Sequence, residues 1–267
     1  STGAEATYAN SMTAFNSNGF SVGSDAIGNG NTSTFVGWQW KAGTTSSSNT
    51  NGTITSTVSV GATQGFSVVT YTGTGANATV GHGLGVAPQM VITKCRGAGT
   101  TSWAVYHISL TSAAYYLLLD STAGQASSST VWNSTAPTST VFSVGSSTAS
   151  NYSTMVAYCF AAVKGFSAFG SYTGNGSTDG PFTYLGFRPR WVMFKNSSTT
   201  GSWVLMDTSR GLYNEMTGTN ALYPNSSVAE GNDPSNRQVD FLSNGFKLRC
   251  TGGDANGSGN TIIYAAF

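Results

Sequence analysis

Stretches in which apolar and polar residues alternate run along most of this chain. Residues 53–60 read Thr-Ile-Thr-Ser-Thr-Val-Ser-Val, and residues 66–71 read Phe-Ser-Val-Val-Thr-Tyr. A period of two places every second side chain on one face of a strand, and β-branched residues favour strands as well. No window keeps the period of about 3.6 residues that an amphipathic helix shows. The pattern therefore predicts a chain built from β-strands.

Short clusters of Gly, Asn, Ser and Pro separate the other predicted strands, for example at residues 73–77 and 121–129. Such clusters mark turns. Many short strands with regular turn signals are typical of sandwiches and jelly rolls, in which two packed sheets bury their apolar faces. We therefore expect an all-β fold of antiparallel sandwiches. The further predicted strands are residues 90–93, 103–108, 115–119, 141–144, 154–160, 166–172, 191–195, 203–207, 239–242, 246–249 and 261–267.

The sequence also repeats itself, which groups these strands into units. Tandem copies of one β-rich unit pack against their neighbours and form an extended array. One landmark occurs three times, which indicates two complete units and part of another. The repeated pieces are Gly-Phe-Ser at 65–67 and 165–167, Tyr-Thr-Gly at 71–73 and 172–174, Trp-Ala-Val at 103–105 with Trp-Val-Leu at 203–205, and the landmark at 34–40, 154–160 and 261–267.

The repeat predicts two sandwiches of the same topology. Superposing them should place Trp103 on Trp203 and Phe160 on Phe267, because these residues occupy matching places in the two copies. The expected parts are residues 1–43 as the C-terminal half of a unit, residues 44–164 as a complete unit and residues 165–267 as another.

The junctions between these parts differ in character. Residues 43–52 are rich in Ser, Thr and Asn and resemble a flexible linker. Residues 160–165 are short and apolar, so we expect the two complete units to pack rigidly on each other. The pattern starts in mid-unit. Two explanations are open: the chain is a processed or truncated product, or the front of its first unit lies in a removed region.

Composition changes the picture mainly by what it excludes. The chain is 39% hydrophobic but only 8% charged, with a net charge of +1, so its polar surface consists of Ser, Thr, Asn and Gly. Balanced charge leaves no electrostatic footprint for nucleic acid or for an anionic membrane. The longest apolar runs fall far short of the roughly 20 residues that span a bilayer, and no signal peptide opens the chain.

Cysteine usage gives no framework for disulfides or metal. Cys95, Cys159 and Cys250 stand in places that the repeat does not reproduce, and no CxxC pair occurs. An odd, unrepeated set predicts small buried thiols rather than disulfides. We expect no metal and no cofactor.

Candidate catalytic residues are few. His82 lies in a glycine-rich turn and His107 at the end of a predicted strand, and an abundance of Ser makes any Ser-His pairing uninformative. Asp207 and Asp240 are a conceivable acid pair for a glycosidase, yet unit 44–164 has no matching pair. Residues 175–180 loosely resemble a calcium loop but lack its closing Glu, so a Gly/Asn turn is favoured. We expect structural roles for all of them and no catalytic site.

Aromatic residues offer the better candidates for a ligand site. Trp103 and Trp203 recur on matching strands, which favours packing in a core. Trp132, Tyr213 and Tyr223 lie in irregular, unrepeated stretches, where a ring can stack on a sugar while Asn and Ser bind its hydroxyls. We expect these three as ligand-binding residues, with burial against their own unit as the alternative.

The repeated pieces are similar to a domain that occurs in tandem in tail-fibre and other structural proteins of tailed bacteriophages. The resemblance covers nearly all of residues 10–267 and leaves residues 1–9 outside. It implies a concanavalin-like jelly roll in a virion appendage that touches the host surface, and it brings no catalytic residues. It is carried by residues 65–73, 80–88, 170–176 and 242–249.

The resemblance and the neutral surface together predict a non-enzymatic virion protein, extracellular on the particle. Its expected role is a tail fibre or similar appendage that adheres to host-surface glycans, where repeated modest sites gain avidity. Its expected partners are other virion proteins, host glycans and copies of itself. Two alternatives stay open: a capsid decoration or appendage spacer without a ligand, and a polysaccharide depolymerase.

The half-unit 1–43 adds an expectation about assembly. It carries Phe20, Phe35, Trp38 and Trp40 without the strands that should cover them, and an aromatic face of that size is unstable when exposed. Phage fibres generally assemble as trimers, so the resemblance implies a homotrimer. The alternative is that the unit at residues 44–164 of the same chain supplies the cover.

Overall fold

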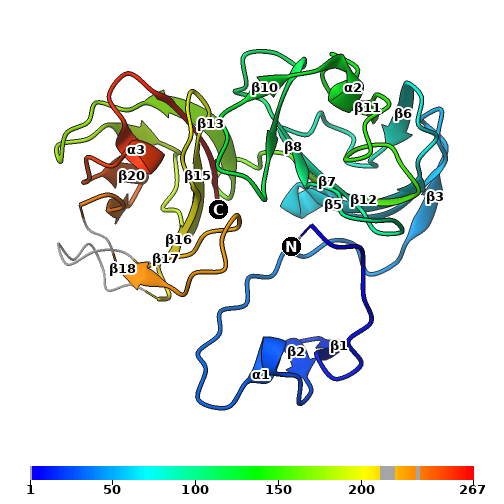
Figure 1. Ribbon diagram of the computed structural model, residues 1–267, viewed down its shortest axis with the longest axis horizontal. Coiled ribbons are helices and arrows are strands. Elements are labelled where there is room, and N and C mark those ends of the chain that lie inside the picture. Colours follow the sequence, from blue (N-terminus) through cyan, green and yellow to red (C-terminus); the bar gives the residue numbers. More distant parts are fainter. Residues whose placement is uncertain (1, 211–219, 233–234) are drawn as a thin grey trace.

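A computed structural model describes residues 2–210, 220–232 and 235–267 of the chain. Strands make up 38% of it and helices 6%, which confirms the predicted all-β fold of antiparallel sheets. Figure 1 shows two β units side by side, unit one in cyan and green and unit two in yellow to red, with a blue N-terminal hairpin apart from both. No helix within the described ranges is long and apolar enough to cross a membrane.

Unit one is built on one large antiparallel sheet. Its elements are β3 (Ser47–Asn49), β4 (Ser56–Gly61), the 3-10 helix η1 (Ala62–Gln64), β5 (Phe66–Thr72), β6 (Ala78–Gly81), β7 (Met90–Cys95), β8 (Ala104–His107), β9 (Tyr115–Leu118), β10 (Ala126–Ser127), α2 (Ser129–Trp132), β11 (Val141–Val144) and β12 (Thr154–Phe160). The sheet has the order β10-β9-β8-β7-β12-β5-β4-β3, and β6 pairs with β11 outside it. The stretch predicted as a linker is therefore partly sheet, because β3 pairs with β4 at the edge.

The described residues of unit two form three smaller sheets. Its elements are β13 (Ala168–Thr173), β14 (Phe182–Tyr184), β15 (Trp191–Asn196), β16 (Trp203–Asp207), β17 (Asn220–Ala221), β18 (Gly231–Asn232), β19 (Val239–Leu242), β20 (Gly245–Leu248), α3 (Gly253–Asn256) and β21 (Thr261–Ala266). The strand orders are β13-β21-β15-β16, β14-β20-β19 and β17-β18.

The two units pair their strands in the same order. The run β5-β12-β7-β8 of unit one corresponds to β13-β21-β15-β16 of unit two, and the pair β6–β11 corresponds to β14–β20. The registers agree as well, since Thr72 pairs with Thr154 and Thr173 pairs with Thr261. The repeat in the sequence is therefore a repeat in strand pairing. The jelly-roll connection within each unit stays a prediction.

Each unit has its own core between two layers. In unit two, Val192 of the four-stranded sheet and Phe246 of the three-stranded sheet belong to one buried cluster. In unit one, Met155 of the large sheet and Phe142 of the β6–β11 pair do the same. Burying an apolar side chain of this size stabilises the fold by roughly 1.5–3 kcal/mol, so these cores hold the layers together.

A third cluster, the interunit core, joins the two units. It exists because alternate residues of a strand point to opposite faces: Ala157 and Cys159 of β12 face the core of unit one, whereas Phe160 faces unit two. Hydrogen bonds cross the same boundary, for example from Trp203 Nε1 to the Leu118 carbonyl at 2.9 Å. The buried residues of the interunit core are Phe66, Met90, Val105, Leu110, Leu117 and Phe160 of unit one, and Phe169, Trp191, Met193, Trp203, Leu205, Ile263 and Ala265 of unit two.

Residues 2–42 form the N-terminal segment, which is not covered as a half-unit should be. The hairpin β1 (Met12–Asn16) and β2 (Gly19–Val22) and the one-turn helix α1 (Ala26–Asn29) lie apart from both units in Figure 1. Phe15 is 80% exposed and Phe35 is 52% exposed. The segment therefore presents apolar side chains to solvent.

The same segment returns to the units through two tryptophans. Trp40 packs edge-on against Trp191 at 5.2 Å and against Phe267 at 5.5 Å between ring centroids, and Trp38 lies 6.2 Å from Trp191. Cover for Trp38 and Trp40 thus comes from the same chain, which was the alternative, whereas Phe20 and Phe35 stay exposed and the homotrimer stays a prediction. The two tryptophans extend the interunit core.

Candidate functional site

Of the three aromatic residues predicted to bind a ligand, Trp132 does not lie at the surface. It is 2% exposed and packs edge-on against Tyr106, with ring centroids 6.2 Å apart. The short helix α2 causes this: Ser128 Oγ accepts a hydrogen bond from Thr130 N and starts the turn that points Val131 and Trp132 inward. For Trp132 the structure therefore shows the alternative, burial against its own unit. Tyr213 lies outside the described residues.

Tyr223 is half-buried and lines a cavity of about 390 Å³ at the surface of unit two. The guanidinium of Arg237 lies 4.8 Å from the centroid of its ring, and Arg237 also forms an ion pair with Asp254 at 2.5 Å. Ser202 and Ser226 line the same cavity. An aromatic ring, a guanidinium and hydroxyls around a shallow hollow are groups that can bind a polar, uncharged ligand.

The two histidines are structural. Ser109 N donates to His107 Nδ1 at 3.1 Å, so this nitrogen carries no proton, and His107 Nε2 donates to the Tyr264 carbonyl across the unit boundary at 3.0 Å. His82 is arranged alike, between Leu84 N at 3.2 Å and the Thr138 carbonyl at 3.1 Å. In both rings each nitrogen is hydrogen-bonded to a backbone group, so none of these contacts pairs a histidine with a nucleophile or an acid.

We expect His107 to make the protein sensitive to acid. Burial lowers the pKa of His107 from 6.5 to about 4, so between these values only the unfolded chain takes up a proton at this position. Its contribution to stability is therefore complete above pH 6.5 and is lost as the pH falls towards 4. A shift of this size corresponds to about 3 kcal/mol. Urea unfolding of wild type and His107→Gln between about pH 7 and about pH 4.5 measures this loss of stability.

The substituted protein should lose distinctly less stability over that interval than the wild type. The slope of stability against pH is the readout, because His107→Gln also alters two hydrogen bonds at every pH. Parallel pH dependences in the two proteins would contradict the assignment of a buried, neutral His107.

The two candidate acids are held by arginines. Asp207 accepts hydrogen bonds from Arg210 Nε at 2.7 Å and from Trp38 Nε1 at 3.1 Å. Burial raises the pKa of Asp207, but the hydrogen bonds from Arg210 and the backbone of Ser209 outweigh it and leave the pKa below its ordinary value. Asp240 accepts from Arg249. The lowered pKa does not favour Asp207 as the protonated general acid that a glycosidase needs.

The remaining candidates are also structural. The three cysteines are free and buried, as predicted, and burial raises the pKa of Cys159 to about 12. In the calcium-like loop, Asn175 Oδ1 accepts from Ser177 N at 3.0 Å, and Asp179 forms an ion pair with Lys247 at 2.8 Å. Over the described part of the chain, no group of three or more His, Cys, Asp and Glu side chains is placed to hold a metal ion.

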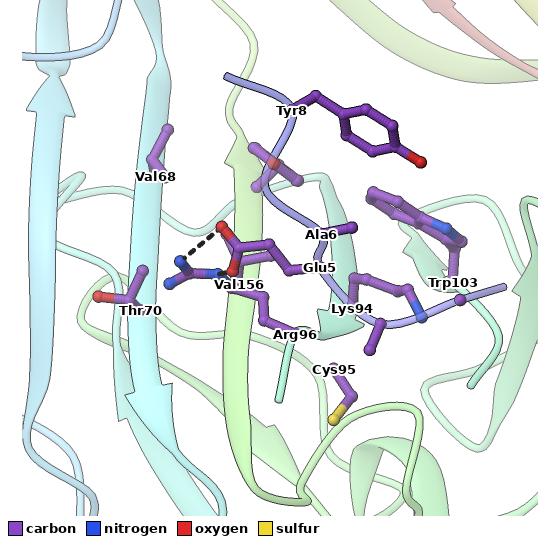
Figure 2. A pocket seen from close by; sticks show the side chains of 13 residues that line it. Glu5, Ala6, Tyr8, Val68, Thr70, Lys94, Cys95, Arg96, Trp103 and Val156 are labelled. Atoms are coloured by element: carbon purple, nitrogen blue, oxygen red, sulfur yellow. Dashed lines mark hydrogen bonds and ion pairs between the residues drawn. The ribbon is translucent and has the colours of Figure 1, made fainter. Parts of the chain in front are cut away.

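A larger hollow lies on the outer face of the unit-one sheet, beneath residues 3–8 (Figure 2). We name this surface the open face. Its cavity has a volume of about 600 Å³. The residues of unit one that line it are Val68, Thr70, Lys94, Cys95, Arg96, Trp103, Val156 and Tyr158.

The open face combines aromatic and charged groups. Trp103 and Tyr158 are half-buried and stack with their ring centroids 6.5 Å apart and their planes 15° apart. Arg96 forms two hydrogen bonds with Glu5, at 2.6 and 3.0 Å, which are drawn in Figure 2. The hydrogen bond from Arg96 lowers the pKa of Glu5. Lys94 Nζ is already bonded, at 2.8 Å each, to the carbonyls of Thr2 and Thr101.

The matching face of unit two is closed. Trp203 stands where Trp103 stands in unit one, yet Trp203 is 1% exposed and lies in the interunit core. Lys94 and its counterpart Lys195 are both buried, and burial lowers the pKa of both, that of Lys195 to about 8. Sequence reasoning assigned both tryptophans to cores. It missed the open face, although the half-unit at residues 1–43 was a signal that one copy would lack its cover.

The fold and these surfaces define an all-β protein of two β units joined by a buried core, with a hollow on the outer face of unit one. The chain belongs to a family described as a domain of unknown function, DUF7483, whose model matches residues 1–267. Searches of curated proteins and of solved structures found no match. The family match includes the N-terminal segment together with both units.

Proposed function

We propose that this chain is a non-enzymatic structural protein in which β units pack in series, as part of a tail fibre or similar appendage of a tailed bacteriophage. The interunit core carries the proposal. Thirteen buried residues contributed by both units join the units, and such packing of neighbours is what holds a repeat array together. The virion location is supported by the resemblance of the repeated pieces alone.

The chemistry of the described residues supports a non-enzymatic role. His82 and His107 are bonded to backbone groups, and Asp207 and Asp240 are bonded to arginines. Because Trp132 is buried, a structural or spacing role is favoured over adhesion through this residue. The surface that remains is neutral and rich in hydroxyl and amide groups, which suits an extracellular appendage.

Immunogold electron microscopy of the particle that carries this protein tests the proposal. Gold is expected on a tail appendage. A regular lattice of gold over the capsid shell would overturn the appendage role and favour a capsid decoration. Release of reducing sugar from host polysaccharide, lost in Asp207→Ala, would overturn the non-enzymatic role and favour a depolymerase.

Adhesion to a host glycan is a second candidate function, and the cavity beside Tyr223 favours it. On a glycan array, Tyr223→Ala is expected to weaken binding at least about tenfold, which corresponds to about 1.4 kcal/mol, because it removes the aromatic surface of the cavity. Tyr184→Ala is the matched control, since Tyr184 is 69% exposed in the same unit and does not line the cavity. Equal binding by wild type and both variants would rule out this cavity as the glycan site.

A further inference from the structure

The N-terminal segment is folded like the C-terminal half of a unit. Asn29, Asn151 and Asn256 each donate a hydrogen bond from Nδ2 to the carbonyl six residues earlier, at 2.8, 2.7 and 2.7 Å. Each of these asparagines precedes one copy of the landmark that the sequence repeats. The same local turn is therefore built three times, twice within complete units and once in the N-terminal segment.

The hairpin of the N-terminal segment also has a counterpart in unit two. Phe15 of β1 pairs with Phe20 of β2, as Phe241 of β19 pairs with Phe246 of β20. Phe241 is 5% exposed and Phe246 is completely buried, whereas Phe15 is 80% exposed and Phe20 is 38% exposed. The difference lies in the cover: β20 pairs with β14 and the hairpin of unit two packs on the four-stranded sheet.

The N-terminal segment docks on unit one as unit one docks on unit two. Thr101 N donates to the Thr2 carbonyl at 3.0 Å, and in unit two Gly201 N donates to the Thr122 carbonyl at 2.8 Å. The two equivalent lysines bond the same two carbonyls, Lys94 at 2.8 Å to Thr2 and Lys195 at 2.9 Å to Thr122.

A second backbone contact repeats three residues further on. Glu5 N donates to the Arg96 carbonyl at 3.0 Å, and Gln125 N donates to the Ser197 carbonyl at 2.9 Å. Residues 2–5 therefore occupy on unit one the place that residues 122–125 occupy on unit two. The established boundary between the units is continued on the open face.

What the open face lacks is the rest of that boundary. On unit two, Val105, Leu110 and Leu117 share the interunit core with Trp203. All three precede residue 122, in the first half of unit one. The exposed hairpin and the half-exposed Trp103 therefore lack the same cover, which the first half of a β unit would supply.

We propose that the open face and the N-terminal hairpin form one docking site for a polypeptide segment that folds as the first half of this same β unit, the counterpart of residues 44–120. That segment pairs a strand with β2, as β14 pairs with β20, and aligns further strands along residues 34–40. Its outer apolar residues cover Trp103 as unit one covers Trp203. The inference rests on the proposed packing of units in series and names the partner that continues it.

Hydrogen exchange on chains extended at the N-terminus tests this proposal. In one extended chain, residues 44–120 are copied in front of Ser1, so that Asp120 precedes Ser1 as it precedes Ser121. In a second, residues 165–236 replace residues 1–10, so that a mismatch of core side chains in one chimera does not decide the result. The amides of β2 and of residues 34–40 are expected to exchange at least about tenfold more slowly in an extended chain than in the original chain.

Two controls keep the test specific. Val69→Asp and Val91→Asp, placed only in the added copy of residues 44–120, put charges at positions that are completely buried in unit one and should abolish the protection. Phe15→Lys should leave the thermal midpoint of the original chain unchanged, because Phe15 is exposed there, and should remove the protection in the extended chain.

Fast exchange of β2 and residues 34–40 in both extended chains, with β7, β12 and β15 still protected, would overturn the proposal. A stable dimer or trimer of the original chain that protects the hairpin would overturn it as well, by identifying a second copy as the occupant. Neither outcome contradicts the packing of units in series, because the protection of β7, β12 and β15 measures that packing separately. Failure of the proposed function would appear instead as gold over the capsid shell.

Discussion

Replacing Trp203 with alanine is expected to lower the free energy of unfolding by about 4 kcal/mol, the usual range for emptying a large buried aromatic site. Trp203 is 1% exposed in the interunit core, and its Nε1 donates to the Leu118 carbonyl of the other unit at 2.9 Å. The substitution therefore removes packing and a hydrogen bond at the same boundary. Urea unfolding followed by circular dichroism measures the loss.

Trp103→Ala is the matched control, because Trp103 occupies the same place in unit one but lies half-buried on the open face. It should lose about 1–2 kcal/mol, since its ring stacks on Tyr158 while one side borders the cavity. Similar losses for the two substitutions would mean that the two faces are covered to the same extent, which contradicts the open face.

Replacing Asn151 with alanine should destabilise the protein by about 3 kcal/mol or more. The substitution leaves several buried backbone groups without a hydrogen-bond partner, and each such group costs about 1–3 kcal/mol. Asn151 is completely buried. Its Oδ1 accepts from Thr74 N at 2.8 Å, and its Nδ2 donates to the carbonyls of Ala76 at 2.6 Å and Gly145 at 2.7 Å. One side chain thus ties two loops of unit one together, and urea unfolding again measures its removal.

Asn256→Ala should have an effect of the same size, since Asn256 makes the equivalent bonds in unit two to the Ser177 and Cys250 carbonyls and from Asn175 N. Asn29→Ala is the control within the same chain. Asn29 keeps only the local bond to Gly23 and is exposed, so its loss should stay within about 0.5 kcal/mol. A large effect at Asn29 would show that the N-terminal segment is already covered.

Local patterns predicted the strands well, because the alternation of side chains is a property of the strand itself. The stretch at residues 154–160 became β12 with those bounds, and residues 203–207 became β16. The repeat predicted equivalent topology for the same reason, since copies with one pattern of strands and turns pair them in one order.

Predictions for individual aromatic residues succeeded less often. Trp132 stands in an irregular stretch and was expected to bind a ligand, but the single turn of α2 directs it into the core of unit one. For Trp38 and Trp40 two sources of cover were open, and the same chain supplies it: Trp40 contacts Phe160 and Trp191, and Trp38 contacts Trp191. In each case the side chain's partner lies far away in the sequence, and no local pattern records it.

The sequence by itself determined the all-β class, the placing of most strands and the existence of repeated units, because these depend on the spacing of apolar residues and on turn residues. Only the tertiary structure decided which copy of each repeated residue is buried. Trp103 and Trp203, or Asn29 and Asn151, occupy equivalent places in the repeat, yet their exposure differs. Burial depends on which surfaces a neighbouring unit covers, and that is a property of the packed array rather than of the local sequence.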